Sequence, residues 1–244
     1  MKLIGYVTSG YPSVEASFEL AEEYLQGGCD MLEISLPLLD NTEAPYLADL
    51  MVQAYMACPD YACHLDAIAR FTARHPSCPV TLLLYQQVAQ HIGAEKLAVF
   101  CEANGICDVN SPNLTDPTLI SVLEHAGIRI AGLVRANFTD EAVEEARDCR
   151  GFVYMTAFAP PEKCRPGFET VAQRIAYVKA AGVTAPLYCG GGVRTPEDAV
   201  KVRAAGADGV FLGTSILKLQ GQHDTLIRTV REFRNAIDAA REGV

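Results

Sequence analysis

The sequence lacks any hydrophobic run that approaches the roughly 18 residues needed to cross a membrane. Its first residues, MKLIGYVTSGYP, turn polar too early for a secretory signal peptide. Half of the 244 residues are hydrophobic, which argues against an intrinsically disordered chain. We therefore expect a globular, cytoplasmic protein with no membrane partner.

Clustered basic residues are also missing. The formal net charge is −10, with 20 Lys and Arg against 30 Asp and Glu. Proteins that bind nucleic acids neutralise phosphates with clustered Lys and Arg, and the sequence shows no such stripe. We therefore expect no nucleic-acid partner.

No CxxC pair occurs among the nine cysteines, and their odd number and scatter do not fit a disulfide framework. We interpret them as structural or incidental reduced thiols. The nearest approach to a metal motif is ACPDYACHLD, with Cys58, Cys63 and His64, but it lacks a second ligand pair at zinc spacing. His64, His75 and His91 are interpreted as surface positions. We expect no metal.

What the sequence does contain is an alternation of short apolar runs with helical segments. The runs are rich in Val, Ile, Leu and Tyr, and their length is typical of buried parallel strands. Ser13 and Thr195 are predicted helix N-caps, the second followed by Pro196 at the first helical position. Several helical segments end in Ala-Gly before the next run, as in alternating α/β proteins. The predicted strands are 2–8, 30–36, 79–85, 107–110, 128–134, 151–156, 185–190 and 209–213.

Eight such βα repeats predict an α/β fold, a parallel (β/α)8 TIM barrel, with residues 1–244 as its single domain. A doubly wound open sheet is the alternative, and it usually has its glycine-rich turn after the first strand. Here the glycine-rich turn, CGGGVRTPED, follows the seventh strand. That position favours the barrel.

The glycines after the seventh and eighth strands predict a phosphate site. In barrels, phosphate often binds the loops after these two strands at the N-terminus of a short helix, where backbone N–H groups are available. Glycines allow the phosphate to approach the backbone closely. The alternative is that both segments are only tight turns. The predicted phosphate-binding residues are Gly190, Gly191, Gly192, Val193, Gly213 and Thr214.

Glu33 is the candidate acid/base. It lies inside the apolar run DMLEISLP, and a carboxylate buried there without a partner is costly. Burial would raise its pKa and make it a proton carrier near neutral pH. The alternative is a structural glutamate paired with a Lys or Arg.

Several segments resemble the tryptophan synthase alpha chain family, and together they cover nearly the whole chain. The most specific is GCDMLEISLPLLDNTEAP, which matches the family's Leu-Glu strand, the Pro four residues later and an acidic loop. The phosphate half is shared with other phosphate-binding barrels. The other matching segments are GYVTSGYPSVEAS, LLLYQQVAQHIG, CEANGICDV and YCGGGVRTPEDAVKVRAAGADGVFLGTSIL.

The resemblance implies a lyase that cleaves indole-3-glycerol phosphate to indole and glyceraldehyde 3-phosphate without metal or organic cofactor. It implies Glu33 as acid/base and a second carboxylate in the following loop. The sequence departs from the family there, because the expected Asp position falls on Ala44. Glu43, after a one-residue gap, and Asp40 are the two candidates, and a solvated loop carboxylate is the alternative for both.

Further residues are implied around the pocket. Tyr85 and Tyr154 match ring-packing tyrosines of the family, although a core role is equally consistent with each. Arg135 follows the fifth strand and is expected to bind an acidic substrate group or pair with Glu33. The loop 157–169 replaces a mobile lid of the family; its prolines are expected to stiffen it, and its Lys163 and Arg165 are candidates for contacting an anion.

Three hypotheses about function follow from the sequence. The first is the lyase, either on indole-3-glycerol phosphate or on a related phosphorylated substrate. The second is a non-catalytic barrel that binds a phosphorylated ligand and regulates a beta-like subunit, suggested by the altered acidic loop. The third is another phosphate-binding-barrel isomerase. A Schiff-base aldolase is disfavoured, because no Lys lies within the predicted strands apart from Lys2.

Overall fold

The computed structural model describes residues 1–39 and 47–242, with side chains described up to residue 240. Two compact units divide these residues. Unit 1 comprises Met1–Gly5, Glu23–Asp30 and Ala131–Val244, and unit 2 comprises Tyr6–Glu22 and Met31–Ile130. None of the helices in the described part of the chain combines the length and apolar character that a membrane span requires.

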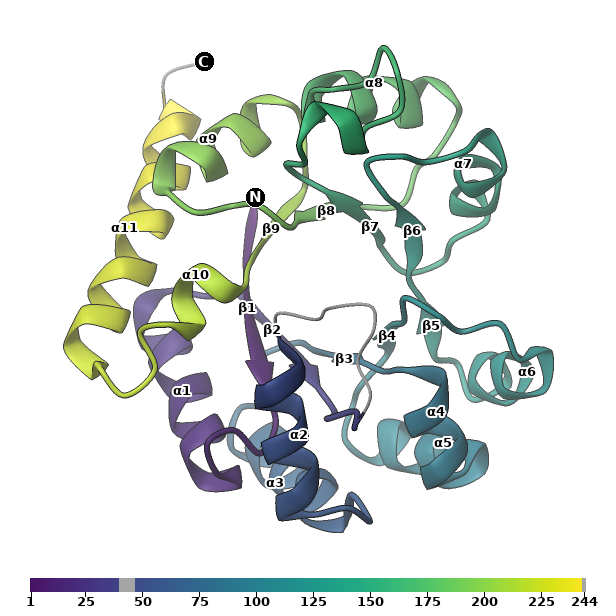
Figure 1. Cartoon of the computed structure of the whole chain (residues 1–244), viewed down its shortest axis with the longest axis vertical. Helices are drawn as coiled ribbons and strands as arrows, with labels where there is room; N and C mark the ends of the chain where they lie inside the picture. Colours follow the sequence, from purple (N-terminus) through teal and green to yellow (C-terminus); the bar gives the residue numbers. More distant parts are fainter. Residues whose placement is uncertain (40–46, 243–244) are drawn as a thin grey trace. The chain divides into compact units, whose positions relative to one another are not determined.

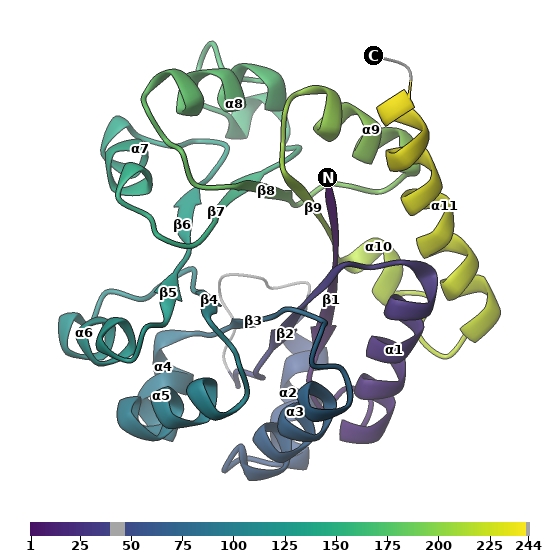
Figure 2. The same ribbon diagram turned by 180° about the vertical axis from the view of Figure 1, so that it is seen from behind.

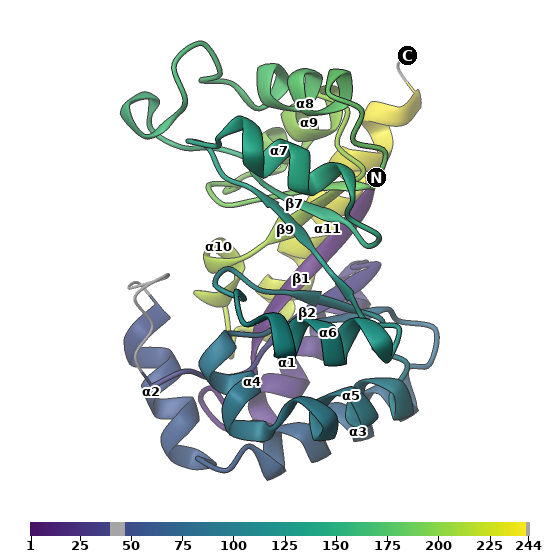
Figure 3. The same ribbon diagram turned by 90° about the vertical axis from the view of Figure 1, so that its right-hand side faces the viewer.

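Unit 1 contains a parallel sheet in the order β1-β9-β8-β7-β6. Figure 3 shows its helices α7, α8 and α9 on one side of strands β7 and β9. The long helix α11 runs beside α9, as Figure 1 and Figure 2 both show. The elements are β1 (Lys2–Thr8, whose last three residues belong to unit 2), β6 (Gly132–Val134), α7 (Asp140–Arg147), β7 (Val153–Thr156), η2 (Pro161–Lys163), α8 (Val171–Ala180), β8 (Leu187–Gly190), α9 (Pro196–Ala204), β9 (Gly209–Leu212), α10 (Thr214–Leu217) and α11 (His223–Glu242).

Unit 2 contains parallel strands in the order β5-β4-β3-β2. Glu33 on β2 is in register with Thr81 on β3, which is in register with Asp108 on β4. The elements are α1 (Val14–Gly27, whose last turn belongs to unit 1), β2 (Met31–Ser35), α2 (Ala48–Ala57), α3 (Ala62–Arg74), β3 (Val80–Leu83), α4 (Gln86–Ile92), α5 (Ala94–Ala103), β4 (Asp108–Asn110), α6 (Pro117–His125) and β5 (Arg129–Ile130).

The order of elements is the (β/α)8 TIM-barrel order that the sequence predicts. All eight predicted runs contain strands, including the weak run 107–110. The predicted strand 128–134 consists of two short strands, β5 and β6, separated by Ala131. The first pairs with β4 and the second with β7, so the nine labelled strands correspond to eight predicted ones.

The predicted helix starts are confirmed. The Ser13 hydroxyl accepts a hydrogen bond from Ala16 N in the first turn of α1. Thr195 and Asp198 form a reciprocal capping box at the start of α9, with Pro196 at its first position. These caps satisfy backbone N–H groups that a helix leaves without intrahelical partners.

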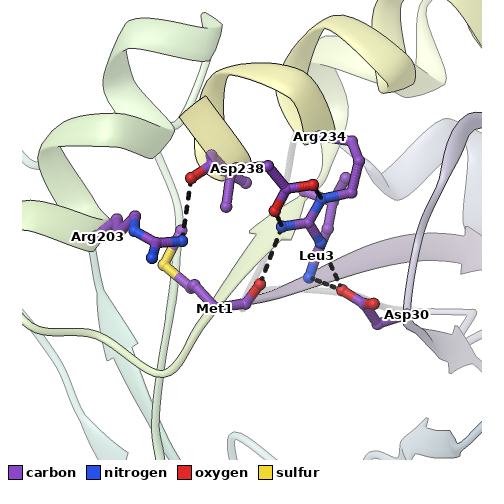
Figure 4. Close-up of polar contacts among 7 residues, drawn as sticks. Met1, Leu3, Asp30, Arg203, Arg234 and Asp238 are labelled. Atoms are coloured by element: carbon purple, nitrogen blue, oxygen red, sulfur yellow. Dashed lines mark hydrogen bonds and ion pairs between the residues drawn. The ribbon is translucent and has the colours of Figure 1, made fainter. Parts of the chain in front are cut away.

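A polar network around Arg234 fixes the start of β1 within unit 1 (Figure 4). Arg234 donates hydrogen bonds to Asp30 at 2.8 Å, to Asp238 at 2.6 Å and to the Met1 carbonyl at 3.3 Å. Asp30 also accepts from Leu3 N at 2.7 Å. Single exposed ion pairs contribute little, but this network joins β1, the segment after α1 and α11 through shared groups.

Cys58 and Cys63 form a disulfide bond, which differs from the reduced thiols that the sequence predicts. The sequence argument considered a framework of many bridges, whereas this pair is local and spans a single turn. The other seven cysteines lie outside any disulfide.

Arg174 anchors the loop that joins β7 to α8. Its side chain is fully buried on α8, and its guanidinium donates four hydrogen bonds to backbone carbonyls. Two go to the end of β7, at Thr156 and Ala157 (3.0 and 2.7 Å), and two go to the end of the loop, at Phe168 and Glu169 (2.8 and 3.2 Å). The guanidinium group of Arg174 thus holds both ends of the loop.

Replacing Arg174 with Met should loosen this loop. Met keeps the apolar stem but removes all four donors, and hydrogen bonds to charged groups contribute about 1.5–3 kcal/mol each. We expect amide hydrogen exchange in residues 157–169 to accelerate at least about tenfold, measured by mass spectrometry. The matched control is the exposed Arg150→Met, which should leave the loop unchanged; equal exchange in both variants would contradict the anchoring role.

Candidate functional site

Glu33 is a buried carboxyl group in the middle of β2. Its residue is 5% exposed, and its neighbours Leu32 and Ile34 are fully buried. Asn110, at the end of β4, donates a hydrogen bond from Nδ2 to Glu33 Oε1 at 2.8 Å. Burial raises the pKa of Glu33 to about 7, although the Asn110 hydrogen bond opposes the shift. Glu33 can therefore both release and accept a proton near neutral pH.

Two tyrosines of unit 2 belong to the same electrostatic environment. The hydroxyl of Tyr6, on β1, accepts a hydrogen bond from the Thr8 hydroxyl at 3.0 Å. Burial raises the pKa of Tyr6, and the charges of Tyr85 and Glu33 add to that effect. Tyr85, which directly precedes α4, is 2% exposed. The predicted Tyr85 and Glu33 thus both lie close enough to Tyr6 to influence its hydroxyl group.

Sequence reasoning missed Asn110 and Tyr6 as neighbours of Glu33. The available signal for Asn110 was a polar residue at the C-terminal end of the run CDVN, because strand ends carry catalytic groups in barrels. Tyr6 gave no such signal, since an aromatic residue inside an apolar strand is most simply a core residue.

The two candidates for the second carboxylate, Asp40 and Glu43, lie outside the described residues, as does Ala44. Their roles stay predictions.

The glycines at and after the end of β8 belong to unit 1, and two of them have neighbours that exclude a side chain. A Cβ on Gly190 would lie 2.7 Å from the Tyr154 hydroxyl oxygen, and one on Gly192 would lie 2.8 Å from Phe158 Cβ. Gly191 and Gly192 also have φ of 77°, which non-glycine residues rarely adopt. Tight local packing therefore accounts for part of the GGG motif without a ligand.

Gly213, after β9, is different, because an added Cβ would meet no atom of the described residues within 4 Å apart from its chain neighbours. Thr214, which begins α10, is exposed. The next residue, Ser215, donates a hydrogen bond from its hydroxyl to the Val193 carbonyl at 3.2 Å. Within unit 1, the structure thus brings together the two loops that the sequence predicts as a phosphate site.

The remaining predicted residues of unit 1 have varied surroundings. Tyr154 lies against Gly190 and packs on Phe211, with ring centroids 5.3 Å apart. Arg135 is exposed directly after β6, and its pairing with Glu33 stays a prediction. Arg165, one of two candidates in loop 157–169 for contacting an anion, forms an ion pair with Asp140 at 2.6 Å, and its role towards an anion stays a prediction.

The interpretation of His64 as a surface residue is wrong. His64 is fully buried in α3, and burial lowers its pKa to about 4, although the Ala54 carbonyl opposes the shift. His75 is half-buried and bonded to Glu22 at 2.8 Å, whereas His91 is exposed as predicted. The pattern around His64 is mixed in polarity, so sequence alone gave little indication of its burial.

The raised pKa of Glu33 predicts a pH-dependent stability. The folded protein holds this proton up to about pH 7, whereas the unfolded chain loses it near the ordinary value of 4.5. The stabilising contribution is therefore complete below about pH 4.5 and is lost as the pH rises through about 7. In the wild-type protein this loss corresponds to roughly 3 kcal/mol at most in the free energy of unfolding. Glu33→Gln cannot ionise and should not show it.

The measurement is the free energy of unfolding in urea at pH 5 and pH 8 for both proteins. The other titrating groups affect both equally, so the difference between their slopes isolates Glu33. Wild-type protein should lose more stability than Glu33→Gln between the two pH values. Parallel slopes would contradict the raised pKa.

Comparison with known proteins supports one family. The family model "Tryptophan synthase alpha chain" matches residues 1–241. Curated tryptophan synthase alpha chains from Novosphingobium aromaticivorans and Geobacter sulfurreducens are each 28% identical to this chain, covering 98% and 99% of it and 91% and 92% of the relatives.

Solved structures agree on the fold. A tryptophan synthase alpha chain from Legionella pneumophila is similar with a TM-score of 0.82 and 23% identity, covering 97% of this chain and 91% of that one. A tryptophan synthase structure from M. tuberculosis gives a TM-score of 0.83 at 23% identity, with 97% and 92% covered. At such identities, these structures establish the TIM-barrel fold. Because the family model spans nearly the whole sequence, the chain belongs to the tryptophan synthase alpha chain family and is a carbon–carbon lyase.

Proposed function

We propose that this protein cleaves indole-3-glycerol phosphate to indole and glyceraldehyde 3-phosphate, with Glu33 as the acid/base. The observation that carries the proposal is the buried Glu33 carboxyl, whose pKa of about 7 suits proton transfer at neutral pH. Asn110 holds one carboxyl oxygen and leaves the other for the substrate. Family membership supplies the reaction class.

The chemistry is a retro-aldol cleavage. The indole ring is protonated at the carbon that bears the glycerol chain, and the neighbouring hydroxyl group loses its proton. The carbon–carbon bond then breaks, leaving indole and an aldehyde, so one proton moves from oxygen to carbon overall. Glu33 is proposed to carry one of these transfers, and Glu43 or Asp40 to stabilise charge that builds on the indole nitrogen.

We further propose that the substrate phosphate binds the loop Gly190–Val193 together with Gly213 and Thr214. The hydrogen bond between Ser215 and Val193, which joins the two loops, supports this proposal. So does the open space at Gly213, because the packing of the described residues does not explain the absence of a side chain there. A beta-like chain as partner and a cytoplasmic location remain part of the proposal, on family grounds.

Two variants should separate chemistry from phosphate binding. Glu33→Gln should lower kcat by about 10²–10⁴-fold, with little change in KM, because it removes proton transfer. Gly213→Ala should raise KM with a smaller effect on kcat, because its methyl group occupies the proposed phosphate position without contacting protein atoms. The measurement is indole release from indole-3-glycerol phosphate, with and without a tryptophan synthase beta chain.

Unchanged turnover in Glu33→Gln would overturn the catalytic assignment. No turnover by wild-type protein under either condition, with indole-3-glycerol phosphate still raising its Tm, would instead favour the non-catalytic, ligand-binding reading. Thermal melting of both variants controls for misfolding.

The second carboxylate is tested by comparing Glu43→Gln with Asp40→Asn in the same assay. Each substitution removes the negative charge and keeps the shape of the side chain. We expect one of the two to lower kcat at least tenfold and the other to act as its matched control. Full activity in both variants would exclude this loop as the source of the second carboxylate.

A further inference from the structure

Three residues of the types that bind metals converge at the turn from α2 to α3 in unit 2. Cys58 follows the last residue of α2, and Cys63 and His64 lie in the first turn of α3. Both sulfurs and one ring nitrogen of His64 lie within 4.8 Å of one another. In tetrahedral zinc sites, ligand atoms are roughly 3.5–3.8 Å apart, given Zn–S distances of about 2.3 Å and Zn–N distances of about 2.0 Å. Once the Cys58–Cys63 bond is reduced, the two sulfurs have to move apart to this spacing before one cation can lie among the three groups.

The backbone of this turn has an unusual conformation that returns Cys63 towards Cys58. Tyr61 has φ of 61°, a left-handed value found at no other non-glycine residue in the described chain. Such residues persist where their surroundings hold them. Here Tyr61 N donates to the Cys58 carbonyl at 3.2 Å, and the Tyr61 hydroxyl donates to the Pro37 carbonyl at 2.9 Å.

The sulfur of Cys58 lies between an N–H donor and a carboxylate. Cys63 N, at the start of α3, donates to Cys58 Sγ at 3.2 Å and favours a negative charge on the sulfur. Asp60 Oδ1 lies 3.2 Å from the same sulfur and opposes that charge, and it also accepts a hydrogen bond from Ala62 N at 3.1 Å. Free N–H groups and the helix dipole stabilise a thiolate at a helix N-terminus. Thiolate is the form of cysteine that binds metals.

The two ring nitrogens of His64 have different surroundings. Its Nδ1 is 3.0 Å from the Ser9 hydroxyl oxygen. Its buried Nε2 has no hydrogen bond of good geometry within the described residues, although the Ala54 carbonyl lies near the ring. A histidine that binds a metal usually has its other nitrogen held by a hydrogen-bond partner. Gly10 makes room for the ring, since a Cβ there would lie 2.5 Å from His64 Cε1.

We propose that Cys58, Cys63 and His64 form a binding site for Zn²⁺ or a similar divalent cation, with water as a fourth ligand. The disulfide is then the oxidised, metal-free state of the same pair. A dithiol reductant, which is itself oxidised to a disulfide, supplies the two electrons and two protons that convert the disulfide to two thiols, and the cation displaces both protons when it binds. The cation would stabilise the turn between α2 and α3. It takes no part in the chemistry proposed for Glu33.

Cobalt titration tests the site directly. The protein is reduced, desalted under argon and checked for nine titratable thiols, and Co²⁺ is then added. We expect one equivalent to bind, with a sulfur-to-cobalt charge-transfer band and the intense visible bands of a tetrahedral site, and Zn²⁺ to displace it. Cys63→Ser should weaken Co²⁺ binding at least 100-fold. The matched control, Cys107→Ser, replaces an exposed cysteine of the same unit and should bind like wild type.

A second measurement needs no variant. Zn²⁺ should slow alkylation of Cys58 and Cys63 in the reduced wild-type protein at least tenfold, mapped by mass spectrometry, while Cys107 reacts at the same rate with or without metal. The proposal is overturned if fully reduced wild-type protein shows no cobalt–sulfur band, or if Zn²⁺ leaves the alkylation of both cysteines unchanged. It is also overturned if Cys63→Ser binds Co²⁺ as tightly as wild type.

Discussion

The rest of this site depends on a single carboxyl group, that of Glu33, which lies in an apolar strand. Glu33 has buried hydrocarbon on both sides along β2 and one amide partner, Asn110. Removing a carboxylate from water disfavours its charge, so the strand itself tunes the group to neutral pH. A cationic partner would have had the opposite effect. For the pKa of Glu33, a neutral amide at position 110 is therefore as important as the glutamate itself.

The glycine-rich loops show that glycine can satisfy two different constraints, close packing and backbone accessibility. Gly190 and Gly192 have side-chain and backbone atoms close beside them, whereas the space beside Gly213 holds no atom of the described residues apart from its chain neighbours. The first kind keeps loops and strands closely packed. The second kind leaves the backbone accessible, which is what a phosphate needs. Distinguishing the two depends on the surroundings of each position and cannot be done from the motif.

The sequence predicted the strands, the helix caps and Glu33 because local patterns encode them. Its failures involve groups that meet only through the fold. His64 is buried because α3 packs near Ser9 and Gly10, which lie more than fifty residues earlier. The division of the fifth predicted run into β5 and β6 likewise depends on which strand each half pairs with.

The ends of the loop after β7 are held by hydrogen bonds to main-chain atoms, so these bonds do not depend on the loop's side chains. Arg174 binds four main-chain carbonyls, and every amino acid carries a carbonyl. Residues between these anchors can therefore change while the anchors themselves keep their partners. Phe158, Cys164 and Arg165 have packing or pairing partners of their own, so the exposed residues 160–163 are the segment to exchange when a new specificity is sought on this scaffold.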